Sequence, residues 1–233
     1  MIDLKRFLCD QHCIPWKLRL LIRKIIPWRI RRLLTRGRIN VNAPMDMDAR
    51  YAAQGDDFAS MENLYEHILT FLPSSGRLLD AGCGIAVLLR AIRHRHPGLE
   101  LHGVDFSKVG VERTIAYGFH AKQTVLPALD YPAQFFDCVV CTEVLEHLDH
   151  PLETIRAFHH VMKPGALLIV SVPNGMGPDH CQEHVQDFTE GSLRACLQEG
   201  GFLDVKVNLV EREPHRKPGA SFVAVSRREC QCS

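Results

Sequence analysis

The chain has 233 residues, of which 46% are hydrophobic and 24% are charged, and its formal net charge is +1. This length suits one globular domain with an additional segment and is short for two full domains. No stretch approaches the roughly 20 consecutive apolar residues that a membrane-spanning helix needs, so the sequence predicts no transmembrane helix.

The nine cysteines are odd in number and scattered, and the sequence shows no signal peptide. Both observations argue against a framework of disulfide bonds. Cys138 and Cys141 have the spacing of a metal-binding pair, but they lie in the apolar run from Phe135 to Cys141. Small buried thiols are common in such runs. We therefore expect reduced thiols and a cytoplasmic protein.

The charge is divided unevenly along the chain. Residues 1–38 hold eleven Lys or Arg against Asp3 and Asp10, a balance of +9, whereas the remainder is mildly acidic. The segment also contains an amphipathic pattern at helical spacing, formed by Leu18, Leu21, Ile22, Ile25 and Ile26. We interpret residues 1–50 as a basic arm and residues 51–233 as the domain that carries the function.

Several partners for this arm stay open. An anionic membrane surface suits a basic amphipathic helix that also contains Trp28, and membrane association is then expected. Packing on the domain, contact with another protein, binding to nucleic acid and a mitochondrial transit peptide are the alternatives.

From Tyr51 onward, short apolar runs alternate with helical patterns, which is typical of a parallel sheet covered by helices. Each of the first five predicted strands is followed by a helical pattern, whereas the last two are separated only by residues 211–219 and should pair antiparallel. The sequence therefore predicts an α/β fold with a Rossmann-like, seven-stranded, mostly parallel sheet, a C-terminal antiparallel hairpin and helices on both faces. The predicted strands are Arg77–Ala81, Glu100–Asp105, Ala121–Val125, Phe136–Thr142, Ala166–Pro173, Phe202–Val210 and Ala220–Arg227.

A glycine-rich turn follows the first predicted strand. Asp80-Ala81-Gly82-Cys83-Gly84 leads out of this strand, and a helix is expected to begin near Ile85. Glycines at these positions allow a tight turn and close approach of a ligand. The motif alone does not separate the several kinds of nucleotide-binding fold.

Two carboxylates narrow the choice of ligand. Asp105 ends the second predicted strand and should emerge beside the turn, where it can accept the ribose hydroxyls of a nucleoside. Asp80 opens the turn itself, and a carboxylate there suits an ammonium and a sulfonium better than a pyrophosphate. Charge therefore favours S-adenosylmethionine over NAD as the cofactor.

Four segments together resemble successive motifs of the class I S-adenosylmethionine-dependent methyltransferases, over roughly Tyr51 to Arg227. They are Leu78 to Ala86, Gly103 to Ser107, Phe136 to Cys141 and Met162 to Gly165. The resemblance implies cofactor contacts from Asp80, Ala81, Gly82, Cys83, Gly84, Asp105, Phe106, Val125 and Thr142. Within this set Asp105 would hold the ribose, Phe106 would pack on the adenine, and Thr142 would lie beside the methionine moiety. Two positions depart from the pattern: Ala86 replaces a third glycine, and no acid accompanies Val125 to meet the adenine amino group.

The chemistry is expected just beyond the fourth strand, at Glu143-Val-Leu-Glu146-His147. If a helical turn forms there, Glu143, Glu146 and His147 project to one side and could hold a divalent cation such as Mg²⁺ or act as an acid–base pair. The downstream His184 could return over the same pocket. Glu143 and His147 are the candidate catalytic residues, and Glu143, Glu146, His147 and His184 are the candidate metal ligands. A purely structural role for this group stays open.

This segment resembles that of the ubiquinone-biosynthesis O-methyltransferases and that of small-RNA terminal 2′-O-methyltransferases. The resemblance implies methylation of a hydroxyl, and a basic arm that docks on a membrane favours a lipophilic small molecule as the acceptor, so we expect an enzyme that methylates such a molecule. The alternatives are methylation of an RNA ribose, and a protein that binds the cofactor without catalysis.

Overall fold

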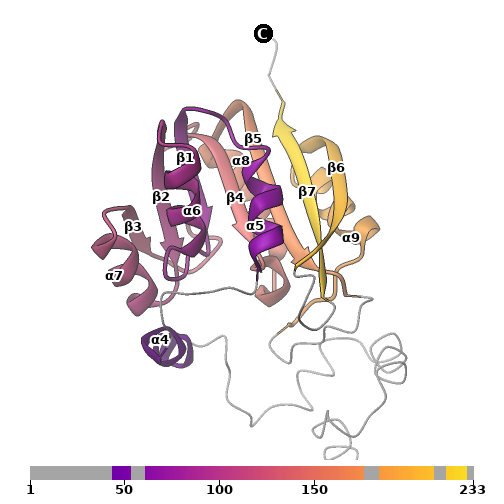
Figure 1. The fold of residues 1–233 in the computed structure, drawn as a ribbon. Helices are drawn as coiled ribbons and strands as arrows, with labels where there is room; N and C mark the ends of the chain where they lie inside the picture. Colours follow the sequence, from indigo (N-terminus) through magenta and orange to yellow (C-terminus); the bar gives the residue numbers. More distant parts are fainter. Residues whose placement is uncertain (1–43, 54–60, 176–183, 213–218, 230–233) are drawn as a thin grey trace, which may run out of the picture.

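The computed structural model describes residues 44–53, 61–175, 184–212 and 219–229. They contain one seven-stranded sheet with the strand order β3-β2-β1-β4-β5-β7-β6 (Figure 1). Pairing from β3 to β5 is parallel, and β7 pairs antiparallel with both β5 and β6. This arrangement confirms the predicted fold class. The strands are β1 Gly76–Ala81, β2 Leu99–Asp105, β3 His120–Gln123, β4 Phe136–Thr142, β5 Met162–Pro173, β6 Phe202–Glu211 and β7 Ala220–Arg228.

Helices cover both faces of the sheet. Leu78 and Leu79 are fully buried in opposite clusters because neighbouring side chains of a strand point to opposite faces. One cluster includes apolar residues of α5 and α6, and the other includes those of α8 and α9. Figure 1 shows the helices beside the sheet. The helices are α4 Pro44–Ala53, α5 Glu62–Leu69, α6 Val87–Arg95, α7 Lys108–Ala116, α8 Pro151–Val161 and α9 Glu190–Glu199, with a 3₁₀ turn η2 at Leu145–His147.

The strand predictions differ from the structure mainly at β3 and β5. The predicted strand Ala121–Val125 is displaced, since β3 occupies His120–Gln123, and β5 begins four residues before the predicted Ala166. The helix expected after the third strand is wrong: residues 124–135 form turns and bends. This segment instead packs Leu126, Leu129 and Tyr131 against the core, so tertiary packing rather than local helix formation orders it.

The predicted boundary between residues 50 and 51 falls inside α4. This helix packs on α7 and is drawn at the lower end of the sheet in Figure 1. The amphipathic pattern from Leu18 to Ile26 lies outside the described residues. Among the residues that the structure describes, no helix is long and apolar enough to cross a membrane.

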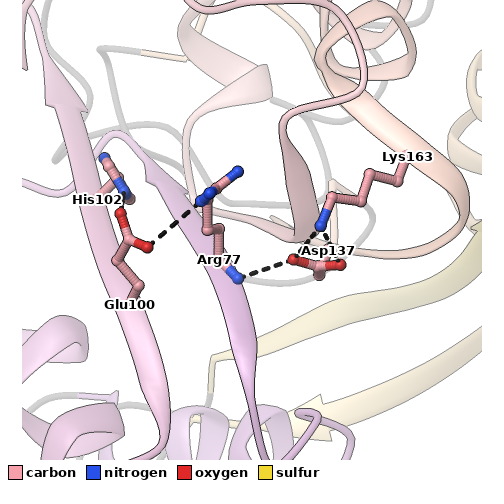
Figure 2. A network of polar contacts seen from close by, with 5 residues as sticks. All are labelled: Arg77, Glu100, His102, Asp137 and Lys163. Atoms are coloured by element: carbon pink, nitrogen blue, oxygen red, sulfur yellow. Dashed lines mark hydrogen bonds and ion pairs between the residues drawn. The ribbon is translucent and has the colours of Figure 1, made fainter.

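A polar network fixes the amino-terminal ends of the parallel strands (Figure 2). Asp137 of β4 accepts a hydrogen bond from the Arg77 backbone N–H of β1 at 2.9 Å and contacts Lys163 Nζ of β5 at 2.7 Å. Arg77 Nε donates to Glu100 of β2 at 3.3 Å, and Glu100 also contacts His102 at 2.8 Å. These contacts link β1, β2, β4 and β5 at the end of the sheet opposite to the one where a ligand is expected.

The carboxyl ends of β1 and β4 form the centre of the opposite edge. The strand order reverses here, because β1 lies between β2 and β4. In open α/β sheets this switch point is where ligands bind. Since β6 runs in the same direction as β5, residues that follow β6 reach the same edge.

Candidate active site

The glycine-rich turn has the conformation that its sequence predicts. Gly82 and Gly84 have positive φ angles of 92° and 51°, which a residue with a side chain rarely adopts. The Gly82 N–H donates to the carbonyl of Val104 at 2.8 Å. A Cβ at Gly82 would lie 2.3 Å from Val144 Cγ2, so any other residue at this position would require Val144 to move.

The helix after the turn begins two residues later than expected, at Val87. Ala86 precedes it with a left-handed φ of 64°. A third glycine would satisfy this conformation without strain, which gives a physical reason for the glycine that the related motif carries.

Asp105 connects the glycine turn to the end of β2. Its Oδ2 accepts a hydrogen bond from the Gly84 N–H at 2.8 Å, and its Oδ1 accepts one from the Ser107 N–H at 2.8 Å. Burial raises the pKa of Asp105, and these two N–H donors counteract that shift. Each carboxylate oxygen can accept a further hydrogen bond, which leaves room for the ribose hydroxyls. The contact between Asp105 and ribose that the sequence analysis expects stays a prediction.

Asp80 is a buried carboxylate at the carboxyl end of β1, with 2% of its surface exposed. Burial and, to a smaller extent, the neighbouring Asp105 raise its pKa to about 7. A nearby cation would restore the charged form, because opposite charge favours ionisation. Asp80 is therefore suited to a positively charged ligand.

Helix α4 contributes two residues that the sequence analysis did not select. Asp48 Oδ1 accepts hydrogen bonds from the Ser107 hydroxyl and from the Val109 N–H, the latter at 3.1 Å, and so caps the start of α7. The Tyr51 hydroxyl lies against the turn, 2.9 Å from where a Cβ of Gly84 would be. Their spacing of three residues places both on one helix face, which is the signal that could have indicated this contact.

The remaining predicted cofactor residues differ in how far their side chains are buried. Ala81 and Cys83 are buried, Phe106 is partly buried, and Val125 is 65% exposed. The Thr142 Oγ1 at the end of β4 is buried and, within the described residues, makes no hydrogen bond. A ligand hydrogen bond at this atom would remove the cost of leaving it unsatisfied.

The helical turn expected over residues 143–147 is wrong in its first part. Glu143 has a left-handed φ of 55°, and the 3₁₀ turn begins only at Leu145. The Glu143 carboxylate is turned toward Ser171 of β5, whose hydroxyl donates to Oε1 at 2.9 Å. It also lies 3.5 Å from Nη2 of Arg212. Glu143 therefore does not share one face with Glu146 and His147.

Glu146, His147 and His184 form a separate group. Their ligand atoms all lie within 4.8 Å of one another, and the two imidazole rings are 5.0 Å apart between centroids. Glu146 is buried, and neither of its carboxylate oxygens makes a hydrogen bond among the described residues. Burial and the nearby charge of Glu143 raise the pKa of Glu146 well above its usual value.

Backbone hydrogen bonds bring His184 to this group from a distant part of the chain. The N–H groups of Val185 and Gln186 donate to the Glu146 carbonyl at 2.9 and 3.1 Å. The Gln186 side chain donates to the carbonyls of Leu148 and Asp149 at 3.0 and 3.1 Å. The segment that begins at His184 is thereby fixed over the turn after β4.

Comparison with known proteins identifies the family. The family model described as a methyltransferase domain matches residues 51–207. The chain belongs to this family. The predicted resemblance to class I S-adenosylmethionine-dependent methyltransferases is thus confirmed for family and fold.

The chain is similar to curated ubiquinone biosynthesis O-methyltransferases. It is 32% identical to that of Pseudomonas aeruginosa (strain LESB58) over 106 residues, which cover 42% of this chain and 44% of the relative. It is 34% identical to that of Azoarcus sp. (strain BH72), with the same two shares. The chain thus matches less than half the length of these relatives.

Solved structures agree on the fold. Haemonchus contortus phosphoethanolamine N-methyltransferase 2, in complex with phosphomonomethylethanolamine and S-adenosylhomocysteine, has a TM-score of 0.66 and 16% identity. The match covers 82% of this chain and 59% of that one. The [4+2]-cyclase SpnF gives a TM-score of 0.66 at 16% identity, covering 81% and 94%. Because SpnF is a cyclase, the shared fold does not determine the reaction.

Proposed function

We propose that this methyltransferase-family chain binds S-adenosylmethionine at the carboxyl ends of β1 and β2 and transfers its methyl group to a hydroxyl oxygen. The observation that carries the proposal is the buried pair of Asp80 and Asp105 beside the glycine turn. Loss of these acids would favour a non-catalytic protein, and both are present.

The site residues fit the cofactor by charge and by hydrogen bonding. Asp80 would face the ammonium and sulfonium groups of the cofactor. Asp105 would accept hydrogen bonds from the ribose hydroxyls with its remaining lone pairs. The unsatisfied Oγ1 of Thr142 would bind the methionine moiety. The turn would hold the sulfonium so that nucleophile, methyl and sulfur can align, which is the main requirement for methyl transfer.

The second part of the proposal is that Glu146, His147 and His184 hold a divalent cation. Two imidazoles and one carboxylate favour Mn²⁺, Fe²⁺ or Zn²⁺ over the Mg²⁺ expected from the sequence, because Mg²⁺ prefers oxygen ligands. Such a cation, held by these three residues, would lower the pKa of an acceptor hydroxyl. Glu146 would then keep its carboxylate ionised despite burial, and the histidines would stay neutral.

The acceptor that we propose is a lipophilic small molecule. This rests on the similarity to ubiquinone biosynthesis O-methyltransferases and on the basic amphipathic pattern of residues 17–36. We propose that this arm binds an anionic membrane surface and brings the enzyme to a lipophilic acceptor. An RNA ribose is the second candidate, favoured by the charge of +9 in residues 1–38.

An acceptor screen with radiolabelled S-adenosylmethionine tests this proposal. The full chain should label phenolic lipids presented in vesicles of phosphatidylglycerol, and a chain lacking residues 1–38 should label them less. RNA that becomes labelled, at a nucleotide whose 3′ linkage then resists alkaline hydrolysis, would support the second candidate instead. If no hydroxyl compound or RNA becomes labelled while an amine or thiol does, O-methylation is wrong.

A further inference from the structure

A line of polar side chains runs along the carboxyl edge of the sheet. Glu143 follows β4, Ser171 lies in β5, Ser221 lies in β7 and Arg212 follows β6, so four neighbouring strands each contribute one residue. Ser171 donates to Glu143 Oε1, and Arg212 Nε donates to the Ser221 hydroxyl at 2.8 Å. The Arg212 guanidinium also lies 3.5 Å from Glu143 Oε2, so the first and last residues of the line contact each other.

The backbone at both ends of this line is also fixed. The Glu143 N–H donates to the Ser171 carbonyl at 3.0 Å, and the Arg212 N–H donates to the Gly219 carbonyl at 2.9 Å. The side chains of Glu143 and Arg212 are 9% and 19% exposed. Arg212, which follows β6, therefore brings a guanidinium to Glu143 beside β4. Figure 1 shows β6 and β7 at the side of the sheet beyond β5.

This arrangement affects the neighbouring cluster of Glu146, His147 and His184 through charge. Glu143 precedes Glu146 by three residues in the segment after β4, and Arg212 Nη2 lies 3.5 Å from the Glu143 carboxylate, so both charges lie beside the cluster. With Arg212 present, Glu143 and Arg212 together carry no net charge. A cation at the cluster then meets the charge of one carboxylate instead of two.

We propose that Arg212 is a positioning residue. It holds the Glu143 carboxylate against Ser171, so that Glu143 does not bind the cation, and its positive charge offsets the negative charge of Glu143 beside the cation site. The inference rests on the cation site of the proposed function. Its consequence is a site with one carboxylate and two imidazole ligands, which leaves the other coordination positions of the cation open to an acceptor hydroxyl.

Electron paramagnetic resonance of Mn²⁺ with the full chain tests this inference. The variants are R212M, R212K, E143Q and the double variant R212M/E143Q, each checked by thermal unfolding. R212M removes the positive charge that lies 3.5 Å from Glu143 and should bind Mn²⁺ more tightly, by about threefold to tenfold. E143Q removes the negative charge beside Arg212 and should bind Mn²⁺ more weakly by a similar factor. R212K and the double variant should bind within about twofold of the unmodified chain.

A merely structural role for Arg212 predicts a different pattern, because loosening the site weakens binding in every variant. Binding by R212M that equals or falls below that of the unmodified chain overturns the inference. If R212M does not fold, E143Q must still bind more weakly than the double variant. Absence of Mn²⁺ binding by the unmodified chain overturns both the cation site and this inference. S-adenosylhomocysteine binding, measured separately, still tests the methyltransferase proposal in that case.

Discussion

Asp105 accepts a hydrogen bond from the Gly84 N–H, and this contact joins the end of β2 to the turn after β1. The carboxylate thereby holds the turn against the neighbouring strand while it lies at the edge where the cofactor is proposed to bind. A single acid therefore has both a structural role and a proposed binding role, and variants must separate the two.

Gly82 offers a direct test of the turn. A methyl group there would meet Val144 Cγ2 at 2.3 Å, whereas a methyl group at Gly118 would meet no atom within 4 Å. Both glycines have positive φ, at 92° and 82°, so both substitutions carry similar backbone strain. Gly82→Ala should therefore lower the free energy of unfolding by about 1–3 kcal/mol more than Gly118→Ala. Urea unfolding measures the difference, and equal losses would show that Val144 moves aside without cost.

Ala86 allows the opposite test within the same segment. Its left-handed φ of 64° is strained for alanine, and its methyl group is fully buried, so in Ala86→Gly the relief of strain should offset the lost burial and leave stability within about 1 kcal/mol. Ala91→Gly in the interior of α6 should destabilise by about 1 kcal/mol, because glycine is a poor helix former. Thermal unfolding of both variants gives the comparison. A clear loss of stability in Ala86→Gly would contradict the strain argument.

The network at the opposite edge predicts a dependence of stability on pH (Figure 2). Hydrogen bonds and ion pairs from Arg77 and Lys163 outweigh the effect of burial and hold the pKa of Asp137 below its usual value. The stabilisation from this group is therefore present above its unfolded pKa and is lost as pH falls through its lower folded pKa. Asp137→Asn should cost about 1 kcal/mol at pH 7 and less at pH 3. A cost that does not change between these pH values would count against the ion pair.

The proposed cation ligands predict a pattern of Mn²⁺ binding. Glu146→Gln and His184→Gln should each weaken Mn²⁺ binding by at least about tenfold, because the first removes the negative charge of the cluster and the second removes an imidazole ligand. His160→Gln provides the control, since His160 is an exposed histidine of α8. Calorimetric titration with Mn²⁺ distinguishes the variants. Equal affinity in all three would show that the cluster is not the binding site.

The sequence predicted the central strands well because buried parallel strands appear as continuous apolar runs, as in Phe136–Thr142. It failed where the structure depends on distant contacts. The segment after β3 packs on the core, and Glu143 lies outside the helical turn with its carboxylate against Ser171 and Arg212. No local spacing indicates that Arg212 approaches Glu143, since the contact follows from the order of β4, β5, β7 and β6.

The central claim is that Asp80 and its neighbours bind the charged end of S-adenosylmethionine, and calorimetric titration with S-adenosylhomocysteine and with NAD tests it most directly. S-adenosylhomocysteine keeps the ammonium group of the cofactor, and burial raises the pKa of Asp80 to about 7. The affinity of the protein for S-adenosylhomocysteine should therefore rise from pH 6 to pH 7.5, as Asp80 ionises. Asp80→Asn should weaken binding and remove this rise, whereas the exposed control Asp130→Asn should change neither. NAD should not bind. Binding of NAD in place of S-adenosylhomocysteine, or an unchanged affinity and pH dependence in Asp80→Asn, would contradict the account.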